Sequence, residues 1–449
     1  MSTTPILNLN RFDASAPGLD AATLRMVRRR EAAFGPNSVL FYKKPIVVAS
    51  ASGAWMTDTD GNRYLDLYNN VPCVGHSNQH VANAICNQSR ILSTNTRYLY
   101  ETIHDYAEKL LATFPNPLRN ITFTCTGSEA NDLALQIVRA CTGGEGIIIT
   151  ENAYHGNTTA VAACSPSAWR TGAPPPANIR RVPAPERFRS ADPDPGATFS
   201  KNIELAINDF RANGLKPAAL LVDTYFTSDG LLDGPAGFLA PAFETARKHG
   251  LLVIGDEVQP GFGRTGVMWN FLRHNAIPDL VTLGKPMGNG FPMGGVVVRP
   301  DLLDRFTREI SYFNTFGGNA LAGATGLAVL EELQGRQLVA NAAKTGAYLK
   351  KRLAELAKQH PCIGDVRGAG LFVGVEFVKT QDKLPQWDGR QPDAAIVTRL
   401  VNRLKELGVL IGASGPFANV IRARPPLCLT ETEADFFVGK LAQALDETN

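Results

Sequence analysis

The stretch PDLVTLGKPMGNGFPMGG, residues 278–295, places one lysine, Lys285, in a loop rich in glycine and proline directly after a short apolar run. A surface lysine usually lies on a helix face among other charges, but this loop cannot continue a helix because proline fixes the backbone angle φ. Glycine lets the backbone approach a neighbouring group closely. The stretch therefore predicts a buried strand followed by a loop that holds one amine at a fixed point.

Short apolar runs alternate with amphipathic helical stretches on both sides of this lysine loop. The runs are NITFTC, GIIIT, AALLVDTY, LLVIGDE, DLVTL and GGVVV. Such alternation is typical of a mostly parallel sheet that is covered by helices on both faces. Residues 165–196, rich in proline, alanine and arginine, predict an irregular surface excursion instead.

The ends of the chain follow a different pattern. Residues 46–67 predict a hairpin with Asp60 and Gly61 in its turn. Long helical stretches, further strand-like runs and a final helix follow residue 324. We therefore predict an N-terminal arm and hairpin at 1–66, a large domain at 67–324 and a small α+β domain at 325–449. The hairpin is expected to join the small domain.

The composition narrows the class of protein. The chain has 449 residues, of which 44% are hydrophobic, and its 45 basic and 42 acidic residues give a net charge of +3. The sequence has no basic stripe of the kind that binds nucleic acid. It also has no run of eighteen apolar residues that could span a membrane, and its first residues lack the apolar core of a signal peptide. The seven cysteines are scattered without a C-x-x-C pair, which disfavours a disulfide framework or a zinc site. We expect a cytoplasmic protein without a metal.

An anion site is expected in the stretch TCTGSEANDLALQIVRA, residues 124–140, where a strand ends and a helix begins near Ser128. Free backbone N–H groups at a helix start, with Gly127 just ahead, suit an anion. The motif is not a P-loop, because no Gly-Lys-Ser/Thr follows. The alternative is an ordinary capped helix with Ser128 as its N-cap.

Two carboxylates end the apolar strand in LLVIGDEVQPGFGRTG, residues 251–266. Ligands bind at the carboxyl end of a parallel sheet, and a carboxylate buried there needs a cation. Asp256 or Glu257 could meet the protonated nitrogen of an aromatic ring. The alternative is a salt bridge to Arg264, which is more reasonable for Glu257 than for Asp256.

A third stretch, ENAYHGNT at residues 151–158, places Tyr154 and His155 before a glycine turn. These side chains could lay an aromatic face over a flat ligand, or they could simply pack in the core. An anion cradle, an aromatic face, a strand-end aspartate and a loop lysine are together what pyridoxal phosphate requires. The aspartate would keep the ring nitrogen protonated, and the lysine would form a Schiff base and then move the substrate Cα proton.

Several motifs resemble the class III (ω-type) aminotransferases of pyridoxal phosphate fold type I, over nearly the whole chain. The matching segments are TGSEANDLAL, YHGNT, GDEVQPGFGRTG, PDLVTLGKPMGNGFP, NTFGGNALA and GDVRGAGLFVGVEF. Within the class, LYNNVPCVGH, TNTRYLYETIHDYAEKL and IRARPPLC look most like the alanine–glyoxylate aminotransferase 2 and phospho-lyase subgroup. The resemblance implies a large domain with a seven-stranded, mostly parallel sheet flanked by helices, and a smaller α+β domain.

The same resemblance implies roles for individual residues. Lys285 and Asp256 would be catalytic, Val258 would pack on the ring face opposite the tyrosine, and Gln259 would reach the ring hydroxyl. Thr315 would reach the phosphate from the neighbouring subunit of a homodimer with shared sites, which could pair further into a tetramer. The full set of cofactor-binding residues would be Gly127, Ser128, Tyr154, His155, Asp256, Val258, Gln259, Lys285 and Thr315.

The substrate is less well defined by the resemblance. Ser228 stands where ornithine- and GABA-type members have a glutamate that neutralises the substrate-binding arginine. Arg422 matches that arginine, and Arg424 could instead form a surface ion pair. We expect an aminotransferase that moves an amino group from an amino acid, ω-amino acid or amine to a keto acid such as pyruvate or glyoxylate, through pyridoxamine phosphate. The alternatives are a phospho-lyase on a phosphorylated amino alcohol or a racemase; a non-enzymatic regulatory module is disfavoured because no DNA-binding unit is attached.

Overall fold

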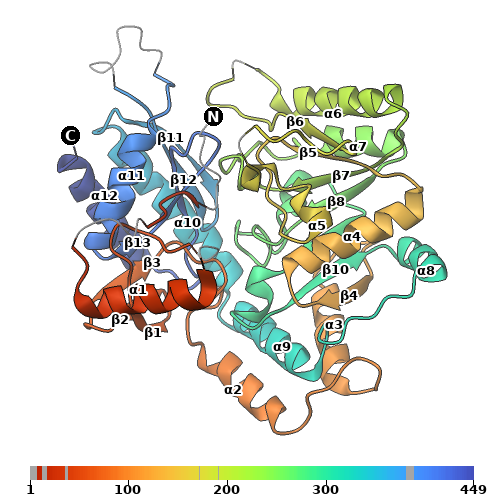
Figure 1. Cartoon of the computed structure of the whole chain (residues 1–449), viewed down its shortest axis with the longest axis horizontal. Coiled ribbons are helices and arrows are strands. Elements are labelled where there is room, and N and C mark those ends of the chain that lie inside the picture. Colours follow the sequence, from red (N-terminus) through yellow and green to blue (C-terminus); the bar gives the residue numbers. More distant parts are fainter. Residues whose placement is uncertain are drawn as a thin grey trace.

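The chain folds into a large body and a small body that lie side by side (Figure 1). The computed structural model describes residues 8–12, 18–35, 39–170, 172–190, 192–380 and 389–448. The helices nearest the two ends of the described chain, α1 (Ala21–Phe34) and α12 (Glu431–Asp446), lie in the small body, whereas the middle of the chain forms the large one. The predicted domain limits at residues 66 and 324 stay a prediction.

The large body is built on a seven-stranded sheet in the order β4-β10-β9-β8-β7-β5-β6. Its strands are β4 (Asn120–Thr124), β5 (Gly146–Thr150), β6 (Ile179–Val182), β7 (Pro217–Asp223), β8 (Leu252–Asp256), β9 (Leu280–Leu283) and β10 (Gly294–Val298). Only β10 runs antiparallel to its two neighbours. The prediction of a mostly parallel sheet is confirmed.

Strand β6 corrects the predicted irregular excursion. It pairs with β5, so that Ile147 lies opposite Ile179. The strand has only four residues, and its two buried ends flank the arginines Arg180 and Arg181, so it lacks the continuous apolar run of the central strands. An edge strand has one neighbour only, and its sequence signal is correspondingly weak.

Helices cover both faces of this sheet because successive strand residues point to opposite sides. The helices α4 (Gly127–Thr142), α5 (Thr159–Ala162) and α8 (Pro300–Glu309) share one apolar cluster with alternate residues of β5, β7 and β10. The helices α6 (Pro195–Ala212) and α7 (Ala240–Lys248) pack on the intervening residues of β5, β7 and β8. Farther along the sheet, α3 (Glu101–Leu111) and α9 (Ala320–Gly335) cover β9 and β10, with α2 (Gln79–Ser89) against α9. The central strands are therefore buried on both sides.

The small body joins the two ends of the chain. One sheet contains β1 (Val48–Ser52), β2 (Trp55–Asp58), β3 (Arg63–Asp66) and β13 (Val409–Leu410), with β13 parallel to β3. The other contains β11 (Ile363–Ala369), β12 (Phe372–Phe377), β15 (Val420–Ala423) and β14 (Gly412–Ser414). The helices are α1 (Ala21–Phe34), α10 (Leu338–Ala357), α11 (Ala394–Glu406) and α12 (Glu431–Asp446). Gly61 has φ of 83° in the predicted turn, between β2 and β3.

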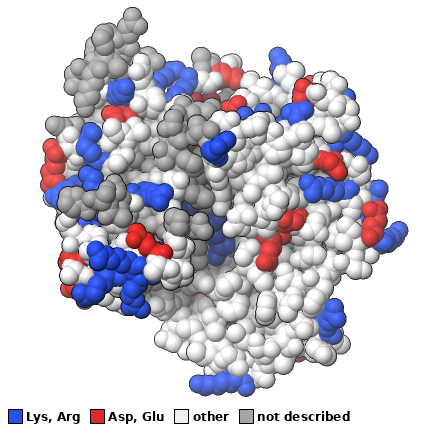
Figure 2. Space-filling view, in the orientation of Figure 1, with Lys and Arg blue, Asp and Glu red and all other residues white. Residues whose placement is uncertain are grey.

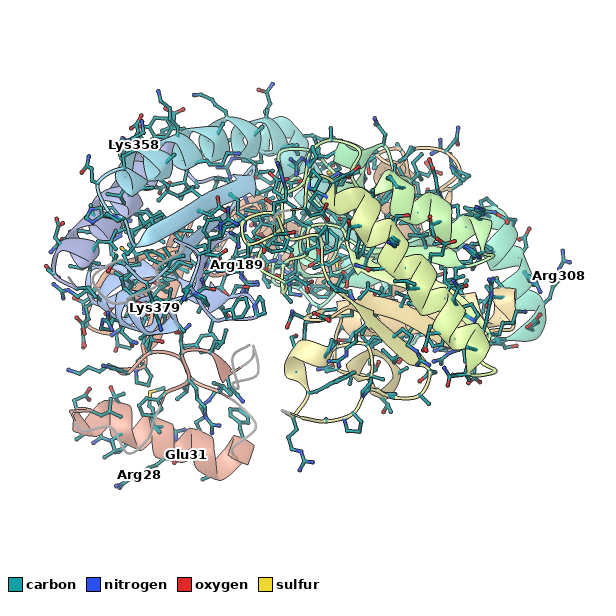
Figure 3. The ribbon with its side chains drawn as sticks, turned by 90° about the horizontal axis from the view of Figure 1, so that it is seen from above. Arg28, Glu31, Arg189, Arg308, Lys358 and Lys379 are labelled. Atoms are coloured by element: carbon teal, nitrogen blue, oxygen red, sulfur yellow. The ribbon has the colours of Figure 1, made fainter. Side chains whose placement is uncertain are left out.

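Charged side chains of both signs are scattered over the face in Figure 2, with one basic cluster at its lower left. Seen from above in Figure 3, α1 lies at one side of the small body and carries Arg28 and Glu31, both exposed. Over the described ranges, no helix is long and apolar enough to cross a membrane. The same ranges contain no cluster of three or more His, Cys, Asp or Glu side chains suited to a metal ion.

Candidate active site

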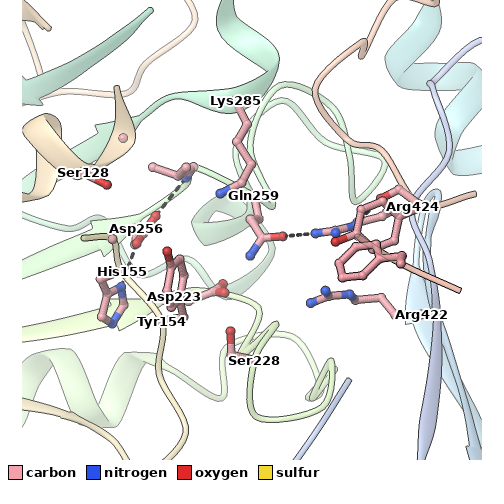
Figure 4. A pocket seen from close by; sticks show the side chains of 15 residues that line it. Ser128, Tyr154, His155, Asp223, Ser228, Asp256, Gln259, Lys285, Arg422 and Arg424 are labelled. Atoms are coloured by element: carbon pink, nitrogen blue, oxygen red, sulfur yellow. Dashed lines mark hydrogen bonds and ion pairs between the residues drawn. The ribbon is translucent and has the colours of Figure 1, made fainter. Parts of the chain in front are cut away.

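A cavity of about 330 Å³ opens at the carboxyl ends of the central strands, and residues of both bodies line it (Figure 4). The structure brings most of the predicted site residues together there: Gly127, Ser128, Tyr154, His155, Asp256, Val258, Gln259, Lys285 and Arg422. Thr315 is exposed and lies outside the lining of this cavity. Its assignment to the neighbouring subunit's site stays a prediction.

Lys285 begins a short 3-10 turn, Lys285–Gly288, two residues after β9 ends. The preceding Gly284 passes so close to Gly127 that a Cβ atom on Gly284 would lie 3.0 Å from the Gly127 Cα. Glycine is therefore needed for the close approach that the sequence predicts. Burial lowers the pKa of the Lys285 amine to about 8, with Asp256 opposing that shift and Arg424 adding to it. The side chain is thus a comparatively easily deprotonated amine that faces the cavity.

Asp256 is the last residue of β8, and its carboxylate is held from three sides. Its Oδ2 lies 2.7 Å from His155 Nδ1 and accepts a 3.0 Å hydrogen bond from Asn131 Nδ2. Its Oδ1 accepts a 3.0 Å bond from the Val258 amide. These contacts fix a buried carboxylate at the cavity wall, and a carboxylate held in this way would favour a protonated ring nitrogen beside it.

Asn131 is a site residue that the sequence analysis missed. Besides Asp256, its Nδ2 donates to the His155 carbonyl at 2.8 Å, and its Oδ1 accepts from Thr282 Oγ1 at 2.8 Å. The available signal was its position on α4: it follows Gly127 by four residues, which places both on one face of the helix. A polar side chain on an otherwise apolar buried face points to a hydrogen-bonding role.

Glu257 points away from the cavity and takes no part in the site. It accepts hydrogen bonds from Thr224 Oγ1 at 2.6 Å and from the Asn270 and Phe271 amides. Burial raises the pKa of this carboxyl to about 8. The alternative of a salt bridge to Arg264 is wrong, because Arg264 donates to the carbonyls of Leu371 and Pro425.

The anion cradle lies at the start of α4. Thr126 caps this helix, since its Oγ1 accepts a 3.1 Å bond from the Glu129 amide, so the alternative of Ser128 as N-cap is wrong. Ser128 Oγ instead accepts from the Asn157 amide at 3.2 Å. A Cβ atom on Gly127 would lie 2.8 Å from Val258 Cγ1. Glycine is therefore required beside Val258, and this helix start, whose first N–H groups have no partner within the helix, lines the cavity.

The side chains of Tyr154 and His155 have different surroundings. Tyr154 is partly buried and lines the cavity, whereas His155 is buried and reaches Asp256. His155 Nε2 has no hydrogen-bond partner among the described residues. Figure 4 shows Tyr154, Asp256 and Lys285 around one space, which would suit a flat ring.

The opposite wall is basic. Arg422 lies in β15, Arg424 lies one residue beyond its end, and both line the cavity. Arg424 is only 7% exposed, so the alternative of a surface ion pair is wrong. Its Nε donates to the Tyr68 carbonyl at 2.5 Å, and its Nη1 donates to Gln259 Oε1 at 2.6 Å.

Arg422 has no such partner. In the part of the chain that the structure describes, its guanidinium makes no hydrogen bond and no ion pair, although the residue is only 8% exposed. Burial, followed by the neighbouring Arg424, lowers its pKa to about 9. Ser228 lines the same cavity and offers no charge to neutralise it.

Three further residues line the cavity, and the sequence analysis assigned no role to any of them. Asp223 ends β7 and accepts bonds from the Tyr225 and Thr227 amides; burial and then Asp256 raise the pKa of its carboxyl. Phe41 and Tyr68 belong to the N-terminal part of the chain, and their rings meet edge to face with centroids 5.3 Å apart. Tyr68 belongs to the quoted segment LYNNVPCVGH and Asp223 to the quoted run AALLVDTY, but only folding brings them and Phe41 to the cavity.

Comparison with known proteins shows which family the chain resembles. The family model described as "Aminotransferase class-III" matches residues 40–445. Arabidopsis thaliana "Alanine--glyoxylate aminotransferase 2 homolog 2, mitochondrial" is 37% identical over 92% of this chain and 85% of its own length. Caenorhabditis elegans "Ethanolamine-phosphate phospho-lyase homolog 1" is 34% identical over the full length of both chains. A solved Arthrobacter phospholyase in complex with phosphoethanolamine is 41% identical, with a TM-score of 0.89 over 94% of this chain and 99% of its own.

The chain belongs to the class III aminotransferases. It is therefore a pyridoxal phosphate-dependent enzyme of fold type I. The residues present fit this cofactor: a helix start that a Cβ atom would obstruct, a fixed carboxylate for the ring nitrogen, and an amine with a lowered pKa. Those groups were identified in the sequence, and the structure places them around one cavity.

Proposed function

We propose that this enzyme transfers an amino group from a small amino compound that carries a carboxylate or phosphate to a keto acid such as pyruvate or glyoxylate. One observation carries the proposal: Arg422 is only 8% exposed and lines the cavity, yet its guanidinium has no carboxylate partner among the described residues. A buried charge is costly unless it is paired, so a substrate anion would supply the missing partner. A guanidinium binds a carboxylate or a phosphate through two parallel hydrogen bonds.

The residues of the chain would divide the chemistry as follows. Pyridoxal phosphate supplies an electron sink for the bond that breaks at the substrate Cα. The N–H groups of Gly127 and Ser128 would bind its phosphate, and Asp256, held by His155 and Asn131, would accept a hydrogen bond from its ring nitrogen. Once free, Lys285 Nζ would take up the Cα proton and deliver it to the cofactor carbon that receives the amino group.

A second candidate function is elimination of phosphate from a phosphorylated amino alcohol. The observation that favours it is the unpaired guanidinium of Arg422, which lines the cavity together with Ser228, where relatives of the ornithine type have a glutamate. The similarity to the phospholyase solved with phosphoethanolamine supports the same candidate. Racemisation has no specific support from the cavity.

Product analysis would separate these candidates. The holoenzyme is incubated with phosphoethanolamine alone, and with alanine plus glyoxylate, and inorganic phosphate and glycine are measured. Glycine formation in the second mixture with no phosphate release in the first supports amino transfer. Phosphate release without any keto acid would contradict it and establish the lyase.

Arg422→Lys tests the anion contact in either case. Lysine cannot reproduce the planar fork, so KM for the anionic substrate should rise with a cost of about 2–5 kcal/mol. Ser228→Glu should act in the same direction, because a carboxylate beside Arg422 would compete with the substrate. Ser228→Ala is the matched control, and an equal rise in KM for this variant would contradict competition by charge.

We also propose a cytosolic homodimer. Thr315 lies in a region with several exposed apolar side chains: Ile91, Tyr98, Leu99, Phe313 and Phe316. The two segments that carry them touch, since Arg97 lies 4.1 Å from the Phe313 ring centroid and Tyr100 donates to the Gly318 carbonyl. A large exposed apolar region favours burial against another surface. Light scattering would test the dimer, and cell fractionation would test the location.

A further inference from the structure

We infer that Arg424 is a positioning residue that acts on the cofactor through Gln259, and that it is not a second arm of the substrate-binding fork. The two side chains are joined by a hydrogen bond of 2.6 Å from Arg424 Nη1 to Gln259 Oε1. Both residues line the cavity, and both are less than a tenth exposed. The inference adds a residue to the cofactor site that the sequence motifs leave unassigned.

The guanidinium of Arg424 is committed to the protein on several sides. Its Nε donates to the Tyr68 carbonyl at 2.5 Å, and its plane lies over the Tyr68 ring at 4.7 Å from the centroid. Its backbone amide donates to the Leu67 carbonyl at 2.8 Å. Cation–π contact and two charge-assisted bonds restrict the rotation of this side chain. Reorienting it toward a substrate would break these contacts.

The bond to Arg424 decides which end of the Gln259 amide faces the cavity. An amide has one oxygen that accepts and one NH2 group that donates, and the two ends are nearly identical in shape. Because the cation holds Oε1, Nε2 must point the other way. Figure 4 shows Gln259 between Lys285 and Arg424, with its amide nitrogen turned into the cavity.

This orientation matters because Gln259 lines the cavity that would hold the cofactor, where it would reach the ring hydroxyl. A donor at that point would favour a negatively charged ring oxygen, whereas an amide turned by 180° would present Oε1 and repel it. Arg422 stands two residues away and has no comparable link to Gln259, so it remains available to the substrate. The two arginines therefore have different tasks: Arg422 meets the substrate, and Arg424 fixes the amide.

The inference rests on pyridoxal phosphate dependence and not on the choice of substrate, so it can fail independently of the proposed function. The test uses the holoenzyme with Arg424→Lys, Gln259→Leu and the double variant. Lysine keeps the positive charge but lacks the planar guanidinium fork. The Arg424→Lys variant therefore distinguishes an effect of amide orientation from an effect of the positive charge alone. The readout is the pH midpoint of the visible absorption change of the cofactor bound at Lys285, measured without substrate.

We expect Arg424→Lys and Gln259→Leu each to raise this midpoint by about 0.5–2 pH units, the range of coupling in hydrogen-bonded networks. A donor on the ring oxygen favours the form that has lost its proton, so loss of the donor raises the midpoint. In the Gln259→Leu background, Arg424→Lys should add almost no further shift. The KM for the keto acid should change less than about threefold for Arg424→Lys, because in this inference Arg424 does not bind the substrate.

Arg422→Lys is the matched control, and it should raise KM while leaving the midpoint in place. An Arg424→Lys shift that persists in the Gln259→Leu background, no shift at all, or a rise in KM as large as that of Arg422→Lys would overturn the inference. If Arg424→Lys fails to retain cofactor, Gln259→Glu tests the link from the other end. It keeps an acceptor for Arg424 but has no N–H donor, and an unchanged midpoint in that variant would refute the role of the amide.

Discussion

The lowered pKa of Lys285 gives a direct test of the site in the apoenzyme. Burial brings the pKa of this amine to about 8, whereas an ordinary lysine titrates near 10.4. At pH 7.4 about 20% of the Lys285 side chains would be neutral, against about 0.1% for an ordinary lysine. The reactive free-amine form is thus enriched about 200-fold, because desolvation disfavours the charged form.

Competitive labelling of the apoenzyme with a trace of acetic anhydride measures this enrichment. The extent of labelling at Lys285 is followed by peptide mass spectrometry from pH 6 to 11, with the exposed Lys201 as internal reference. Labelling at Lys285 should rise with a midpoint near pH 8, because burial lowers the pKa of this amine to about 8. In the holoenzyme, borohydride reduction should fix the cofactor on the same peptide.

Asp256→Asn tests the direction in which Asp256 shifts the pKa of Lys285. The carboxylate of Asp256 raises the pKa of the amine against the effect of burial, so its removal should move the labelling midpoint to lower pH. A midpoint near pH 10 in the wild-type apoenzyme, or an upward shift in Asp256→Asn, would refute the electrostatic argument. Borohydride label on a different lysine would refute the assignment of Lys285 itself.

Three other outcomes are expected. Asp256→Asn should lower kcat by about 10²–10³-fold, the usual cost of one preorganised electrostatic group, and weaken cofactor binding less; near-normal turnover in steady-state assays would contradict its role. Thr315→Ala should retain cofactor poorly, and mixing it with Lys285→Ala should regenerate activity if sites are shared, whereas mixtures without gain would exclude sharing. Gly346→Ala should lower Tm with a cost of about 1–3 kcal/mol, because its Cβ would lie 1.9 Å from a carbonyl oxygen of the β11–β12 turn, while Gly335→Ala, with open space around it, should not.

Local patterns in the sequence were sufficient for the sheet and for the cofactor side of the site. The continuous apolar runs predict strands buried on both faces, and six of the seven strands of the large sheet lie in them. Lys285, Asp256 and Gly127 stand at strand ends or at a helix start, so their place at the carboxyl edge follows from the order of the elements. Strand β6 was not predicted, because an edge strand need not be apolar throughout.

Which of the two cavity arginines has a partner was decided by tertiary structure, and the role of Arg422 in substrate binding stays a prediction. The choice between Arg422 and Arg424 depends on which guanidinium finds a partner, and Arg424 finds Tyr68 and Gln259 from segments more than 150 residues away in the chain. Likewise, Thr126 rather than Ser128 caps α4, since a capping bond depends on backbone geometry at the turn. The sequence alone determined the strand periodicity and the reactive groups; contacts between distant segments decided which polar groups are paired, because burial and hydrogen bonding are properties of the folded neighbourhood.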